Sequence, residues 1–240
     1  MTEIVVMTSN VGNGRARPED LIPAFANSGA DLIAIQELSE HQAAAIAADL
    51  EQQFPHQAVF PGGFAGKAVL SRFPITTSEQ LHLSPHRPDL HAVVQINGAE
   101  IAFLVAHPIP PKLSWAGLRF DGETWSQIRT LADMAVENPP AVLLGDFNMA
   151  DWWGEYAYIR TAGLKDAFAV AGPKRGSTLP RRIGPWKRFT SLNRALSGLP
   201  LFPVLRVDYI WYTEPLHCQE AWIGDDTGSD HLPVLARLAL

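Results

Sequence analysis

The sequence predicts an α/β protein with mixed β-sheets at its centre and helices outside them. Short apolar runs alternate with segments of helical periodicity, which is typical of strands covered on both faces. Residues 91–107 add a clear β-hairpin, because HAVVQI and EIAFLVAH flank Asn97-Gly98, the pair that a type I′ turn requires. A hairpin combined with βα alternation indicates sheets that contain both parallel and antiparallel strands.

The first half of the chain alternates strands with helices. Pro18 suits the first turn of a helix, and the acidic residues Glu19 and Asp20 are favourable near a helix N-terminus. A second segment, before Phe54, has apolar residues at helical spacing and good helix formers. We therefore expect strands at 3–11, 30–37 and 67–70, and helices at 18–28 and 40–54.

The second half continues this pattern after the hairpin. A helix expected at 121–137 stops before Pro139-Pro140, because a proline disfavours the helical conformation of the residue that precedes it. Another helix, at 152–162, ends at Gly163. The strands expected in this half are 141–144, 207–213, 217–223 and 232–240.

The bulk composition is that of a globular domain. The 240 residues are 47% hydrophobic and 18% charged, which is ample for a sizeable core and far from a disordered composition. No Pro/Gly/Ser-rich linker divides the chain, so we expect a single domain over residues 1–240. The one cysteine, Cys218, excludes an internal disulfide. Since no signal peptide or membrane-spanning stretch is present, we expect a soluble cytoplasmic protein and favour a monomer.

Four short strings contain polar side chains that could meet at one divalent cation, and each of the first three follows an apolar run at the point where it ends. In open α/β sheets this edge is where ligands bind. Oxygen-rich groups with one or two imidazoles suit Mg²⁺ or Mn²⁺ and phosphoryl chemistry. The strings are IAIQE, VAHP, LLGDFN and GSDH, and they contain Glu37, His107, Asp146 with Asn148, and Asp230 with His231.

Each string also has an ordinary structural interpretation. Gly, Asp and Asn are common turn formers, Glu37 could be an acid at a helix start, and His107 could be a core histidine. Asn10, which closes the first strand, gives the weakest signal of the set. The order of these residues along the chain, more than any one of them, therefore favours catalysis.

The whole series resembles the endonuclease/exonuclease/phosphatase superfamily. GDFN followed by a C-terminal SDH is quite specific for that superfamily, although it identifies no substrate. The resemblance implies a four-layer α/β sandwich, in which two mixed β-sheets pack face to face with helices on the outside. The matching positions span the chain: Asn10, Glu37, SRFP at 71–74, His107, GDFN at 145–148, VDYI at 207–210 and GSDH at 228–231.

The resemblance also implies a metal site. Glu37 would be the principal Mg²⁺ ligand, with Asn10 and Asp230 nearby, and Mn²⁺ could take the place of Mg²⁺. Two departures from the family pattern stand out in this sequence. Gly12 replaces a residue that is polar or acidic in many relatives, and His107 lies in Ala-His-Pro where Asn-Thr-His is more usual.

Catalytic roles follow from the same resemblance. Asp146 would orient or deprotonate the attacking water, and Asn148 would donate to the phosphate. His231 is similar to the family's catalytic imidazole at the scissile phosphate, with Asp208 fixing its tautomer and raising its basicity. His107 would be the second imidazole, stabilising charge on the phosphate or on the leaving oxygen.

The charge distribution suggests one region of contact with an anionic substrate. A net charge of −6 argues against coating nucleic acid by bulk attraction, yet no acidic residue lies between Asp166 and Asp208, where basic and aromatic residues alternate. A solvated basic loop is the ordinary interpretation. Beside the cleft, the same cations could grip phosphates and the aromatics could stack on a base. The candidate substrate-binding residues are Arg181, Arg182, Trp186, Lys187 and Arg188.

Together these features predict a divalent-metal-dependent phosphodiesterase that uses an activated water for in-line attack. We favour a nuclease acting on DNA, or on RNA, with low sequence specificity. The same cations and apolar residues would suit an anionic membrane surface, so a phospholipid or small-molecule phosphodiesterase of the sphingomyelinase kind is the alternative. A third hypothesis, an inactive binding module, is disfavoured because no key carboxylate or histidine is missing.

Overall fold

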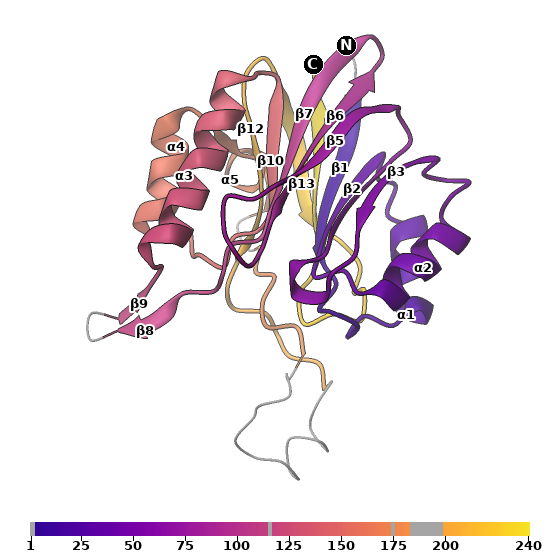
Figure 1. Ribbon diagram of the computed structural model, residues 1–240, viewed down its shortest axis with the longest axis horizontal. Coiled ribbons are helices and arrows are strands. Elements are labelled where there is room, and N and C mark those ends of the chain that lie inside the picture. Colours follow the sequence, from indigo (N-terminus) through magenta and orange to yellow (C-terminus); the bar gives the residue numbers. More distant parts are fainter. Residues whose placement is uncertain (1–2, 115–116, 174–175, 183–198) are drawn as a thin grey trace.

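The computed structural model describes residues 3–114, 117–173, 176–182 and 199–240. Two six-stranded mixed sheets face each other, and helices cover the outer face of each (Figure 1). The predicted four-layer α/β sandwich is therefore confirmed. Among the described residues, no helix combines the length and the apolar character needed to cross a membrane.

The first sheet is built around the N-terminal strand. This strand pairs in parallel with β2 and antiparallel with β14, so the beginning and the end of the chain share one sheet. In order across the sheet, the strands are β13 (His217–Ile223), β14 (Val234–Ala239), β1 (Glu3–Asn10), β2 (Leu32–Gln36), β4 (Lys67–Ser71) and β3 (His56–Phe60).

The second sheet contains the predicted hairpin. Asn97 and Gly98 have φ of 50° and 92°, as the two central residues of a type I′ turn require. In order, its strands are β11 (Lys165–Asp166), β12 (Asp208–Tyr212), β10 (Ala141–Asp146), β7 (Ala99–Ala106), β6 (Asp89–Ile96) and β5 (Ile75–Leu81). A separate small hairpin projects from the body (Figure 1), formed by β8 (Lys112–Ser114) and β9 (Gly117–Arg119).

The helices cover the two outer faces (Figure 1). The helices α1 (Pro18–Ala26) and α2 (Glu40–Asp49) lie on the first sheet, and α3 (Gly122–Glu137) and α4 (Gly154–Ala162) lie on the second. The short α5 (Ala167–Ala171) packs near β12 and β13, and a 3₁₀ turn, η1, spans Gly63–Ala65. Side chains cap three of these helices: Ser39 forms a capping box with Gln42 at α2, Asp121 accepts from Thr124 N at α3, and Asp166 accepts from Phe168 N at α5.

Three apolar clusters lie between these four layers. The central one joins the inner faces of the two sheets and includes Val6 and Phe103. A second cluster packs Phe25 and its neighbours against the first sheet, and a third packs Ile128 against Leu143 of the second sheet. The near-continuous apolar runs belong to strands such as β2 and β10, which are buried along their whole length because both of their faces are covered.

The sequence missed several elements that carry little apolar periodicity. β5 is an edge strand whose residues 76–79 are exposed, so it lacks a buried run that could have identified it. β3, β8, β9, β11 and α5 are short and were likewise not predicted. The last strand begins at Val234, two residues later than expected, because Pro233 has no backbone N–H to contribute to a ladder.

Candidate active site

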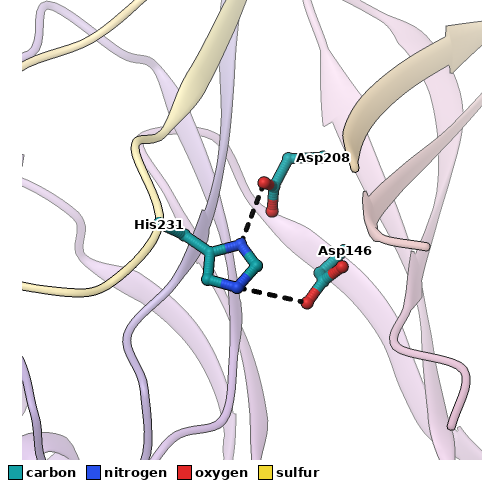
Figure 2. Close-up of side chains that lie close together, drawn as sticks. All are labelled: Asp146, Asp208 and His231. Atoms are coloured by element: carbon teal, nitrogen blue, oxygen red, sulfur yellow. Dashed lines mark hydrogen bonds and ion pairs between the residues drawn. The ribbon is translucent and has the colours of Figure 1, made fainter. Parts of the chain in front are cut away.

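Two carboxylates and an imidazole meet at the edge of the second sheet. Asp146 ends β10 and Asp208 begins β12, and the two face each other in the antiparallel register. His231 comes from the loop before β14 of the other sheet. Its Nδ1 lies 3.0 Å from Asp208 Oδ2, and its Nε2 lies 3.8 Å from Asp146 Oδ2 (Figure 2). All three residues are buried.

Asp146 also contacts residues at the ends of strands in both sheets. Asn10 Nδ2 donates to Asp146 Oδ2 at 2.9 Å and lies 3.3 Å from Glu37 Oε1. His107 Nε2 lies 3.5 Å from both Glu37 Oε1 and Asp146 Oδ2. The structure therefore brings together residues from five separate segments of the chain, around one carboxylate.

Unusual backbone conformations hold two of these side chains in place. Glu37 has a φ of 56°, in the left-handed region that non-glycine residues seldom occupy, and its carbonyl accepts from Asn13 N at 2.8 Å. Asn148 has a φ of 52°, a conformation that asparagine tolerates better than most residues. In the GDFN string, Gly145 is required because a Cβ there would collide with the Ala106 carbonyl oxygen of β7.

Burial and neighbouring charges raise the pKa values of both Asp146 and His231. Burial raises the pKa of Asp146 to about 6, and the negative charge of Asp208 adds to this increase. For His231, burial alone would lower the pKa, but the carboxylates of Asp208 and Asp146 outweigh it and raise the pKa to about 9. His231 is thus expected to carry a proton at neutral pH, directly beside a carboxylate that is easily protonated.

The second imidazole has the opposite character. Burial lowers the pKa of His107 well below its usual value, and the positive charges of Arg87 and Lys67 lower it further. Arg87 Nη1 lies 2.8 Å from His107 Nε2, which suits donation from the guanidinium to a neutral ring. The pKa values of the two imidazoles are therefore shifted in opposite directions.

Comparison with known protein families identifies the family to which this chain belongs. The sequence model of the Endonuclease/Exonuclease/phosphatase family matches residues 7–231, nearly the whole chain. The chain belongs to this family. Membership in the endonuclease/exonuclease/phosphatase family makes it a hydrolase of that class, and the predicted resemblance is confirmed. No curated protein matches the chain significantly.

Solved structures of family members have the same fold. An endonuclease/exonuclease/phosphatase family protein from Leptotrichia buccalis is similar with a TM-score of 0.71 and 20% identity, covering 99% of this chain and 100% of that one. An AP endonuclease from Archaeoglobus fulgidus has a TM-score of 0.70 and 19% identity, with 97% and 98% covered. Sphingomyelinase C from Streptomyces griseocarneus has a TM-score of 0.65 and 17% identity, with 99% of each chain covered. At these identities the likeness shows the fold and leaves the substrate open.

The donor groups of this family site fit a hard divalent cation. In the described part of the chain, ligand atoms of Asp146, Asp208 and His231 lie within 4.8 Å of one another. The Oδ1 atom of Asp208 is buried and has no hydrogen-bond partner among the described residues, which leaves one acceptor available. Glu37 and Asp146 supply further carboxylate oxygens beside Asn10, and such oxygens are what Mg²⁺ and Mn²⁺ prefer. Glu37 and Asn10 would hold the metal, whereas a protonated His231 has no free ring nitrogen to offer it.

The remaining predicted residues lie at different distances from this centre. Asn148 Nδ2 donates to the Pro108 carbonyl at 3.1 Å, next to His107. Asp230 pairs with Arg15, and its role as a metal ligand stays a prediction.

Two of the predicted substrate-binding cations already have a carboxylate partner. Arg181 Nε and an Nη of Arg182 each lie 2.9 Å from Asp226 Oδ2, so the two guanidinium groups share one carboxylate. Their role in substrate binding stays a prediction. The other three candidates, Trp186, Lys187 and Arg188, lie outside the described residues.

Sequence reasoning missed two cations that contribute to the site, Arg87 and Lys67. Arg87 contacts His107, and Lys67 is buried at the start of β4. A weak signal was present for Lys67, because a lysine opens an otherwise apolar strand, KAVLS. Arg87 follows a polar, bend-rich loop and carried no such signal.

Proposed function

We propose that this family member is a divalent-metal-dependent phosphodiesterase that cleaves DNA, and RNA as a second substrate, with low sequence specificity. The supporting observation is the convergence of the imidazoles of His107 and His231 with Glu37 and Asp208 around Asp146. Hydrolysis of a phosphodiester needs a positioned water, compensation of the phosphate charge and assistance to the leaving oxygen. The site offers a group for each of these tasks.

Each residue of the site has a task that its geometry allows. Asp146 accepts a hydrogen bond from the attacking water and orients it, while Asn10 holds the Asp146 carboxylate. His231, kept protonated by two carboxylates, presents Nε2–H to the phosphate and can transfer a proton to the leaving oxygen. Asp208 fixes the His231 tautomer through Nδ1. A bound Mg²⁺ or Mn²⁺ would supply charge compensation at the phosphate oxygens.

One specific observation favours a second candidate function, hydrolysis of phospholipids. Large apolar side chains are exposed on segments that project from the body, namely Leu113 on β8, which is 82% exposed, and Phe202, which is 95% exposed. Exposed apolar side chains near cations suit a lipid surface. The fold similarity to a sphingomyelinase C is compatible with this alternative.

A substrate panel tests the proposal. Plasmid DNA, RNA, sphingomyelin vesicles and a bis-aryl phosphate are each incubated with Mg²⁺, with Mn²⁺ or with EDTA. We expect metal-dependent nicking of the plasmid that falls steeply as salt is added, because the protein must displace counterions from the nucleic acid. Release of phosphocholine from the vesicles, without nicking of the plasmid, would contradict the nuclease function and support hydrolysis of phospholipids. Absence of hydrolysis from every substrate would contradict both functions and favour a binding module.

A further inference from the structure

Arg87 is a cation of the site to which no role has yet been given. It lies two residues before β6 and is half-buried. Its Nη1 atom is 2.8 Å from His107 Nε2 and 3.4 Å from the Pro108 carbonyl oxygen. Neither contact is with a carboxylate, so neither compensates the positive charge of the guanidinium.

Within the described residues, Arg87 forms no ion pair with a carboxylate, whereas the arginines elsewhere near the site do. Arg15 pairs with Asp230, and Arg181 with Asp226. Burial lowers the pKa of Arg87, and the more distant charges of Glu37 and Asp146 only oppose this effect. A guanidinium that has lost water without gaining a contacting anion is energetically costly unless a ligand supplies that anion.

The surroundings of Arg87 indicate where such an anion would lie. Asn148 Nδ2 donates to the same Pro108 carbonyl oxygen, at 3.1 Å, that Arg87 Nη1 approaches. Arg87 and Asn148 thus lie side by side at the Pro108 carbonyl oxygen, next to His107, and each group has further N–H donors that this oxygen does not take up. Converging N–H donors of this kind match the oxygens of a phosphate.

The backbone that carries Arg87 is held rigidly by buried polar groups. Lys67 Nζ donates to the carbonyl of Pro88, the residue after Arg87. Asp89 accepts from His107 N at 3.4 Å and from Gln127 Nε2 at 2.7 Å. Since Lys67 and Asp89 are 1% and 0% exposed, the segment is fixed to β4, β7 and α3 at once. Such preorganisation is what electrostatic stabilisation of a transition state requires.

We propose that Arg87 is a further catalytic residue, which donates to a non-bridging oxygen of the scissile phosphate next to Asn148. The inference rests on the proposed function, because it assumes a phosphodiester or phosphate group at this site. The proposal gives the contact with the scissile phosphate to Arg87, which has no carboxylate partner among the described residues. Arg181 and Arg182, the arginines predicted from the sequence, instead share the carboxylate of Asp226.

The kinetic test compares Arg87→Gln and Arg87→Lys with Arg160→Ala, which removes an exposed arginine from α4. We expect Arg87→Gln to lower kcat about 10²-fold with a smaller change in KM, as loss of one transition-state donor does. Arg87→Lys restores part of the rate because it keeps the charge without the planar fork. The Arg160→Ala variant keeps wild-type rates. Full activity in a folded Arg87→Gln protein would overturn the assignment.

A binding measurement separates this role from a structural one and from failure of the proposed function. Inorganic phosphate in the presence of Mg²⁺, and Mn²⁺ alone, are titrated into wild type and Arg87→Gln by calorimetry. We expect phosphate binding to weaken about tenfold or more while Mn²⁺ binding is unchanged. Equal loss of Mn²⁺ binding, or unchanged phosphate binding, would overturn the proposal. The binding measurement does not depend on turnover. If the wild type hydrolyses none of the panel substrates, the proposed function is contradicted, while the titrations still test the role of Arg87.

Discussion

At the residue scale, Asp146 is the side chain that unites the site. Its Oδ2 atom accepts from Asn10 and lies within 3.8 Å of both His107 Nε2 and His231 Nε2. Its partners come from both sheets, so a small change in the packing of the sheets would alter several of its distances. The pKa of Asp146, raised to about 6 by burial, reflects this enclosure.

The pair formed by His231 and Asp208 supports a first prediction. His231→Ala removes the protonated imidazole and is expected to lower kcat by 10² to 10⁴, about the contribution of a general acid or base. Asp208→Asn keeps the shape but removes the charge that holds the ring, so we expect a loss of about 10- to 100-fold. Initial rates on plasmid DNA with Mg²⁺ measure both effects. His41→Ala, at an exposed histidine of α2, is the control, and an equal loss in that variant would contradict the assignment.

At the scale of secondary-structure elements, caps and loop anchors position the functional side chains. The cap of α3 is Asp121, which accepts from Thr124 N at 2.9 Å and from Lys112 Nζ of the β8–β9 hairpin at 3.1 Å. The loop before β12 is anchored by Arg206, whose Nη2 lies 2.7 Å from Asp166 Oδ2. This loop leads directly into Asp208, so the ion pair of Arg206 with Asp166 helps to position Asp208 beside His231.

The cap of α3 gives a prediction with a defined pH dependence. The backbone and side-chain hydrogen bonds of Thr124 and Lys112 lower the pKa of Asp121 to about 2 in the folded state, against about 4 in an unfolded chain. The ionised cap therefore contributes stability above about pH 4, and this contribution is lost as pH falls towards 2. We expect Asp121→Ala to cost about 1 kcal/mol of unfolding free energy near pH 7, in urea titrations. A difference from wild type that grows as the pH falls would contradict the assigned sign.

The anchor of the β12 loop gives a larger effect on stability. Asp166 is buried and also accepts from Tyr156 Oη at 2.9 Å, while Arg206 packs over the Tyr209 ring at 4.4 Å. Arg206→Ala leaves a buried carboxylate without its cation, which typically costs about 3–5 kcal/mol. Urea unfolding measures the loss. Lys165→Ala, which breaks the exposed pair with Glu214, is the matched control and should change stability little.

At the scale of the whole molecule, the apolar cluster between the two sheets keeps the site assembled. Asp146 and Asp208 lie in strands of the second sheet and His107 directly follows β7 of that sheet. Asn10 ends β1 of the first sheet, Glu37 directly follows β2, and His231 precedes β14. The central cluster contains residues of both sheets, so its packing sets the separation of these two groups. The site can therefore form only when the sandwich has formed.

Phe103 in this cluster tests the prediction of a single domain over residues 1–240. Its side chain is fully buried, so Phe103→Ala should destabilise the fold by about 3–5 kcal/mol. Because the sheets share this core, we expect one cooperative transition by fluorescence and circular dichroism, with coincident midpoints. The exposed Glu100 on the same strand provides a control, Glu100→Ala, expected within about 0.5 kcal/mol of wild type. Two separated transitions would contradict a single domain.

The sequence by itself determined the elements and motifs that depend on local chemistry. Apolar runs located most strands of the two sheets, Asn97-Gly98 specified the hairpin turn, and strand-end positions selected Glu37, His107 and Asp146. The tertiary structure alone decided which charges are compensated. Only long-range packing pairs Arg181 with Asp226 and leaves Arg87 beside His107 without a carboxylate. Charge compensation depends on distances between residues far apart in the chain, and local sequence patterns contain no information about those distances.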